Sequence, residues 1–144
     1  MNETVITQWS GNMAFESRIE EYRIRMDADA TVGGTGKGPR PKPLVLSALA
    51  GCTGMDIISI LSKKRVVPDS FSISVTGELR DEFPKYYKKI RIVFELKGKD
   101  FENSPDILAK VERAVQLSRE TYCAVSAMLK GSCEISHEII LKNS

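Results

Sequence analysis

The feature that most constrains this chain is one long apolar stretch, Leu44 to Leu61, which reads LVLSALAGCTGMDIISIL. Pro43 is tolerated at the start of a helix and the cations at 63–65 suit a helix C-terminus, so we predict a central helix over residues 43–64. Its apolar residues fall on nearly every face, and a helix of this kind must be covered on every side. A chain of 144 residues has too little protein to cover it alone, so we expect a second subunit to bury it.

The same stretch approaches the length of a membrane span, but Asp56 interrupts it and the chain offers no second candidate. A buried helix and no membrane are therefore expected. The net charge of +2, with basic residues scattered among acidic ones, makes no case for nucleic acid. Residues 1–10 show no signal peptide, and three widely spaced cysteines are typical of a reducing compartment, so we expect the cytoplasm.

Periodicity and turn residues predict the remaining elements. Strands are expected within residues 1–32, at 3–9, 13–19 and 22–28, followed by a glycine- and proline-rich loop at 33–43. Further strands are expected at 71–80, 88–98 and 133–141, with a helix opening at Ser104-Pro105 and a short third helix at 122–130 capped by Thr121. The order βββ-α-ββ-α-α-β, with ββααβ over 66–142, predicts one α+β domain over 1–144: a mostly antiparallel sheet crossed by the central helix.

Two of the cysteines suggest chemistry. Cys52 alone is more often a small buried hydrophobe than a nucleophile. Cys123 would lie in the first turn of the third helix, where backbone N–H groups and the helix dipole stabilise a thiolate. If the two helices pack together, the pair could react with a peroxide in two steps, through a sulfenic acid and then a disulfide. The alternative is that both cysteines only pack in the core and have no chemical role.

A metal or cofactor is not expected from the spacing of the residues. No two cysteines are close in the sequence, and Cys133 and His137 on one strand would stand about 13 Å apart. That separation is too large for a shared zinc ion with bonds near 2 Å. The segment GGTGKG at 33–38 does not match a phosphate-binding loop. Thr31 stands where the first glycine is required, and Gly38 where a serine or threonine is required.

Three segments together resemble the OsmC/Ohr family of thiol peroxidases, in particular its OsmC-like branch. They are PLVLSALAGCTGMDIISIL, GELRDEFPKYYKKIRIVFELKG and AVQLSRETYCAVSAML, and the similarity runs from about Met26 to Ile139. The resemblance implies an intertwined homodimer with sites at the subunit interface. It also implies an oxidative-stress enzyme that reduces organic hydroperoxides to alcohols with a dithiol such as a dihydrolipoyl group. Cys52 matches the peroxidatic cysteine of the family and Cys123 the resolving one.

The chain departs from the family in the charged groups around the reactive thiol. Peroxidase members of the family hold an arginine beside the thiolate, and a glutamate nine or ten residues before the reactive cysteine binds that arginine. Here Lys42 and Pro43 occupy the positions of the glutamate. Among Arg18, Arg25 and Arg40, Arg25 lies nearest the position of the family arginine.

Four further charged residues are candidates for a supporting role. Asp56 lies four residues after Cys52 on the same helix face, where it could hold a cation near the thiol or simply form a buried polar contact. Glu78, Arg80 and Glu82 could supply charges across the interface, or could form a solvated strand end. The alternative function is a non-catalytic or redox-sensing protein that binds a small molecule on the same fold.

Overall fold

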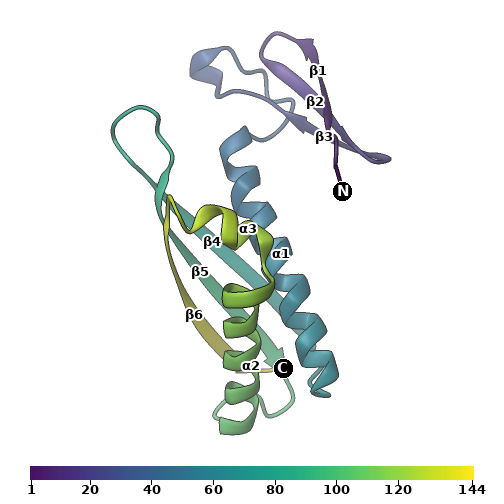
Figure 1. Ribbon diagram of the computed structural model, residues 1–144, viewed down its shortest axis with the longest axis vertical. Coiled ribbons are helices and arrows are strands. Elements are labelled where there is room, and N and C mark those ends of the chain that lie inside the picture. The colour runs from purple at the N-terminus through teal and green to yellow at the C-terminus, as the bar shows by residue number, and fades with distance from the viewer. The chain divides into compact units, whose positions relative to one another are not determined.

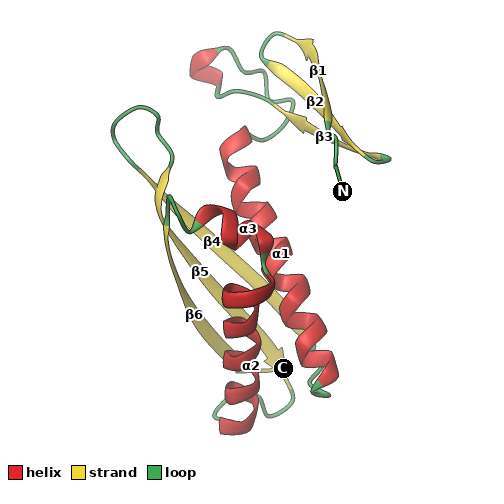
Figure 2. Ribbon diagram, viewed as in Figure 1, coloured by secondary structure: helices red, strands yellow, loops and turns green.

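The computed structural model describes all residues, 1–144. The chain forms two compact units, Met1–Val45 and Leu46–Ser144. Figure 1 labels their helices and strands along the chain, and Figure 2 colours them by type. The observed order has the predicted α+β elements: three strands, a long central helix, two strands, helices and a last strand.

The first unit is built on an antiparallel sheet of three strands in the order β1-β2-β3. The strands are β1 (Ile6–Gly11), β2 (Ala14–Ile19) and β3 (Tyr22–Met26). Tight turns join them at Asn12 and Glu20, whose φ angles of 49° and 54° lie in the left-handed region that short hairpin turns use. All three N-terminal strands are therefore confirmed.

Asp27 organises the loop that follows β3. Its side chain is buried, and its carboxylate accepts hydrogen bonds from the backbone N–H groups of Ala28 (2.8 Å), Thr35 (3.0 Å) and Lys37 (3.0 Å). The bonds from Lys37 and Thr35 are the main cause of the lowered pKa of this carboxyl. The glycine-rich loop is thus tied down by one ionised side chain.

The central helix α1 (Pro41–Lys63) begins two residues before the predicted start at Pro43. Both prolines fit, because the first four N–H groups of a helix have no partner within it. Its 23 residues span about 34 Å. By length and composition α1 could cross a membrane, but a core helix passes the same test and one such helix is a weak indication.

The second unit contains a three-stranded sheet in the order β4-β5-β6. β4 (Ser70–Leu79) and β5 (Tyr87–Gly98) form an antiparallel hairpin, whereas β6 (Glu134–Asn143) runs parallel to β5. The parallel pairing follows from the crossover through α2 (Pro105–Leu117) and α3 (Ala124–Leu129), since parallel neighbours need a long connection.

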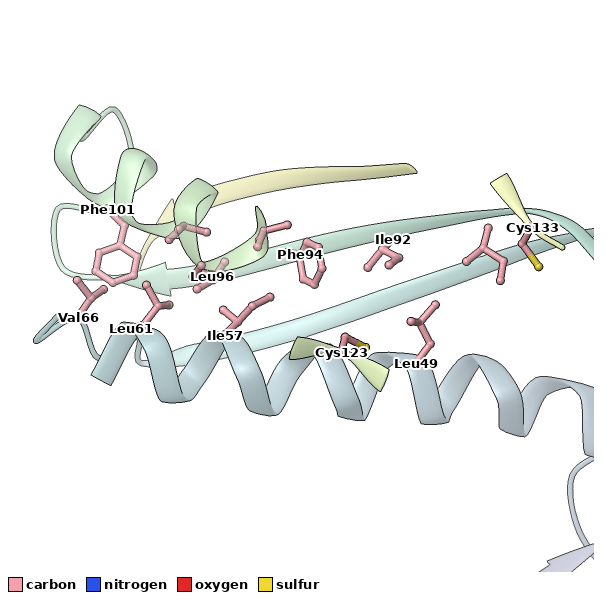
Figure 3. Packing of buried hydrophobic residues seen from close by; sticks show 14 residues of the cluster. Leu49, Ile57, Leu61, Val66, Ile92, Phe94, Leu96, Phe101, Cys123 and Cys133 are labelled. Carbon is pink, nitrogen blue, oxygen red and sulfur yellow. The ribbon is translucent and has the colours of Figure 1, made fainter. Parts of the chain in front are cut away.

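The core of this unit lies between the sheet and the two helices that cover one face, α1 and α2. Alternate residues of β5 point to that face and are fully buried, and Figure 3 shows Phe94 and Leu96 on the side of β5 that faces Ile57 and Leu61 of α1. The side chains that form this core are Leu49, Ile57, Leu61, Val66, Ile90, Ile92, Phe94, Leu96, Phe101, Val111, Ala114 and Val115, with Cys123 and Cys133.

Only one stripe of α1 is buried within the chain. Its buried residues recur every fourth position, at Leu49, Thr53, Ile57 and Leu61. Elsewhere on the helix Met55 is 75% exposed, and Val45 and Ile58 are also exposed. The second unit by itself therefore leaves apolar side chains of α1 exposed, and the dimer that would cover them stays a prediction.

Candidate active site

Helix α1 presents two reactive side chains on one face, one turn apart. Cys52 and Asp56 stand at positions i and i+4, and both are half-buried. The small residue Gly51, next to the cysteine, has open space where a Cβ would stand. Gly51 is exposed, and Cys52 and Asp56 are neighbours on one face of α1.

Cys123 lies at the start of α3, as its N-cap residue and not in its first turn as predicted. The segment Ser118–Tyr122 continues α2 as a wide π-helical turn, and the N–H of Cys123 bonds to the carbonyl of Ser118 (2.8 Å). Thr121 lies inside this turn and does not cap α3. Cys123 itself is the N-cap residue, and its Sγ accepts a hydrogen bond from the N–H of Ser126 (3.3 Å).

The fold brings three ionisable groups together. The Sγ atoms of Cys52 and Cys123 and a carboxylate oxygen of Asp56 all lie within 4.8 Å of one another. All three cysteines of the chain are free thiols. Figure 3 shows Cys123 against α1, between Leu49 and Ile57. Two thiols separated by 71 positions in the sequence are thus close enough for shared chemistry, while their individual roles stay predictions.

A pair of buried hydroxyl groups holds Asp56 in place. Ser118 Oγ donates a hydrogen bond to Asp56 Oδ2 (2.8 Å), and it lies 2.8 Å from Thr53 Oγ1. Because Ser118 has one hydroxyl proton and the carboxylate takes it, the Thr53 hydroxyl donates to Ser118. Within this unit Asp56 accepts this hydrogen bond and forms no ion pair, and its role beside Cys52 stays a prediction.

Sequence reasoning missed Thr53 and Ser118 as members of the site. Ser118 was recognisable only as a polar residue on the buried face of the second helix, and Thr53 only as a neighbour of Cys52. Both are buried. A buried hydroxyl needs a partner, and that requirement was the one available signal.

The electrostatics at Cys123 oppose the predicted thiolate. Burial is the main cause that raises the pKa of this thiol, and together with the Cys52 thiol and the Asp56 carboxylate it brings the pKa to about 11, against the hydrogen bond from the Ser126 N–H. The expectation of a thiolate stabilised by the helix start is therefore wrong for Cys123. Desolvation outweighs the single N–H bond, and α3 has only six residues.

The supporting residues Glu78, Arg80 and Glu82 form ion pairs within their own hairpin. Arg80 contacts Glu82 (3.1 Å), donates to Tyr86 Oη (3.0 Å) and lies over the Tyr86 ring, while Glu78 pairs with Lys88 (3.2 Å). All of these residues belong to the hairpin formed by β4 and β5. None of them pairs with Asp56 inside the unit.

Arg25 lies on β3 in the first unit. There its Nε pairs with Glu16 Oε2 at 3.4 Å, and Arg23 pairs with the other oxygen of the same carboxylate at 3.4 Å. The predicted role of Arg25 as the cation beside Cys52 stays a prediction.

A cavity of about 410 Å³ opens beside the carboxylate. Its walls combine apolar side chains with two lysines at one end of α1. The lining residues are Asp56, Ser59, Ile60, Lys63, Lys64, Leu117 and Tyr122. Cavities of this volume accommodate small organic molecules.

The third cysteine stands apart from this constellation. Cys133 Sγ donates to the carbonyl of Tyr87 (2.8 Å), and His137 contacts Arg119. Cys133 and His137 therefore have partners of their own. Among the His, Cys, Asp and Glu side chains, the group able to hold a metal is Cys52, Asp56 and Cys123.

Comparison with known proteins gives consistent matches. A family described as "OsmC-like protein" matches residues 34–138. The chain is 38% identical over 117 residues to Protein YhfA of Escherichia coli strain K12, covering 81% of this chain and 80% of that protein. A crystal structure of a hypothetical protein from Aquifex aeolicus VF5 is 31% identical over 98% of both chains, with a TM-score of 0.80.

A more distant match is the organic hydroperoxide resistance protein OhrB of Bacillus subtilis, 19% identical, with a TM-score of 0.65 over 96% of this chain and 98% of that one. At this identity the likeness shows a common fold.

Proposed function

The chain belongs to the OsmC-like protein family, and from that premise we propose that it is a cysteine-based peroxidase that reduces organic hydroperoxides to alcohols. The observation that carries the proposal is the approach of the Cys52 and Cys123 sulfurs to within 4.8 Å. One of these thiols is partly accessible and the other is buried. A peroxide can therefore reach Cys52, while burial shields Cys123 from solvent.

In the first step the Cys52 thiolate attacks an oxygen of the peroxide. The O–O bond breaks, an S–O bond forms, and the leaving alkoxide takes a proton from solvent to become the alcohol. Cys52 is oxidised to a sulfenic acid and the peroxide is reduced. The resemblance to family peroxidases assigns a nearby arginine to the thiolate, and Arg25 is our candidate.

In the second step Cys123 resolves the sulfenic acid. Its sulfur attacks the Cys52 sulfur, an S–S bond forms, and water leaves with the Cys123 proton. The raised pKa of Cys123 keeps this thiol protonated, and hence unreactive toward peroxide, until a sulfenic acid forms beside it. An external dithiol, such as a dihydrolipoyl group, would then reduce the disulfide by two exchange steps.

The proposal includes a homodimer, with the exposed apolar side of α1 covered by the second copy. Met55 and Ile58 would otherwise leave large apolar side chains in water. The three free cysteines favour a reducing compartment, so we propose that the protein is cytoplasmic.

The test is an assay of the reduced protein with cumene hydroperoxide and a dithiol. We expect Cys52→Ser to abolish turnover, because the nucleophile is lost. Cys133→Ser is the matched control and should keep the parent activity, since Cys133 lies outside the thiol pair. Mass spectrometry after a short peroxide pulse should find a Cys52–Cys123 disulfide in the parent. A Cys52→Ser protein as active as the parent would refute the proposal.

The second candidate is a redox-sensing or non-catalytic protein that binds a small molecule. Two observations favour it: the cavity of about 410 Å³ beside Asp56, and the burial that raises the pKa of Cys123. In that case both thiols would stay reduced through the peroxide pulse, and the assay would give no turnover.

A further inference from the structure

The thiol pair and Asp56 have the composition and arrangement of a metal site. Cysteine spacing along the chain predicted none, but the fold places two sulfurs and a carboxylate oxygen within 4.8 Å of one another. The ligands of a tetrahedral zinc ion lie about 3.4–3.8 Å apart, given bonds of roughly 2.0–2.3 Å. Side-chain rotations that move the ligand atoms by about 1 Å would therefore close the three groups around one ion.

The helix supplies two of the ligands in a suitable register. Cys52 and Asp56 are separated by four residues on α1 and so project from one face. Cys123 comes from a different element, at the N-cap of α3. Ligands from two packed elements can surround an ion, which a single helix face cannot do.

The hydroxyl pair would act as the outer support of this site. Asp56 accepts one hydrogen bond from Ser118, and its carboxylate keeps further lone pairs that can bind a metal ion. Ser118 is itself held by Thr53, and both are buried. Metal-binding carboxylates usually have such a hydrogen-bonded partner, which fixes their orientation.

We propose that in the reduced protein Cys52, Asp56 and Cys123 bind one zinc ion per chain, through two thiolates and one carboxylate, with the fourth position open. Thiolate ligands favour zinc over magnesium or calcium, which prefer oxygen. Each thiol that is protonated releases its proton on binding.

A disulfide between Cys52 and Cys123 would consume both sulfur ligands. Zinc and peroxide would therefore compete for the same reduced thiols, and zinc would inhibit turnover. This regulatory consequence rests on the proposed function, whereas zinc binding itself requires only the three side chains.

The test is a titration of anaerobic, reduced, metal-free protein with Zn²⁺ against a chromophoric chelator. We expect one ion per chain, and at least a tenfold loss of affinity in Cys52→Ser, Cys123→Ser and Asp56→Asn. Cys133→Ser and Asp106→Asn are matched controls, a third thiol and an exposed carboxylate of the same unit, and should bind as the parent does. Circular dichroism checks that each variant is folded.

Cobalt gives a second readout that does not depend on activity. Co²⁺ bound by two thiolates should produce sulfur-to-metal charge-transfer absorption and the d–d bands of a tetrahedral ion. Two results would overturn the proposal: a parent protein that does not compete with the chelator, or Cys52→Ser and Cys123→Ser variants that bind zinc as the parent does.

The two proposals fail in different ways. Zinc binding is measured without peroxide, and peroxidase activity is measured with chelator and without zinc. A protein that binds zinc through these residues but does not turn over peroxide would refute the peroxidase alone. A protein that turns over peroxide but shows no zinc binding would refute the metal site alone.

Discussion

The hydroxyl of Ser118 joins the buried Thr53 to Asp56 of the candidate site. We predict that its removal lowers the free energy of unfolding. Ser118 is 0% exposed, donates to Asp56 and accepts from Thr53. Ser118→Ala leaves the Thr53 hydroxyl, which is 1% exposed, without an acceptor. A buried polar group without a partner costs about 1–3 kcal/mol, and loss of the bond to the half-buried carboxylate adds to it. We expect about 2 kcal/mol of destabilisation.

The double variant separates this explanation from a general packing defect. Thr53→Val removes the orphaned hydroxyl with little change of shape. We therefore expect Ser118→Ala with Thr53→Val to be more stable than Ser118→Ala alone, by about 1 kcal/mol, because contacting residues do not behave additively. Ser62→Ala, at an exposed position of the same helix, is the control and should stay within about 0.5 kcal/mol of the parent.

The assay is urea denaturation of reduced, metal-free protein at one fixed concentration, since an oligomer would make stability depend on concentration. With a slope of about 2 kcal/mol per molar urea, Ser118→Ala should lower the midpoint by about 1 M. Equal midpoints for Ser118→Ala and Ser62→Ala would refute the reasoning, as would a double variant no more stable than Ser118→Ala.

Two further predictions concern the charge beside the thiols and the exposed side of α1. In a protein with Cys52→Ser and Cys133→Ser, we expect Asp56→Asn to lower the pKa of Cys123 from its raised value, because a negative neighbour is removed. The thiolate absorbance at a given pH should then rise, which reports a larger thiolate fraction. We expect a rise of less than about tenfold, because burial is the larger cause of the raised pKa. A titration curve that does not change would contradict the role assigned to Asp56. Met55→Glu places a charge on the exposed apolar side of α1, and light scattering should show that the proposed dimer dissociates into monomers. Lys110→Glu on α2 is the control and should leave the dimer intact. A parent protein that is monomeric, or a Met55→Glu protein that stays dimeric, would contradict the proposed interface.

The secondary structure was largely predictable because its signals are local. Alternation of apolar residues placed the strands, and the long apolar run placed α1 to within two residues at its start. Errors arose where neighbouring elements decide the local geometry. The wide turn at Ser118–Tyr122 moved the cap of α3 from Thr121 to Cys123, and no sequence pattern announced it.

The sequence by itself determined the kind of fold, because apolar periodicity and turn residues act over a few neighbouring positions. It also made Cys52 and Cys123 candidates for chemistry, through the two cysteine motifs that resemble the family. Only the tertiary structure decided that Cys52, Asp56 and Cys123 share one site, and that Thr53 and Ser118 support it. It also decided that the pKa of Cys123 is raised, because this pKa depends on the burial and the neighbouring groups that packing of distant segments creates.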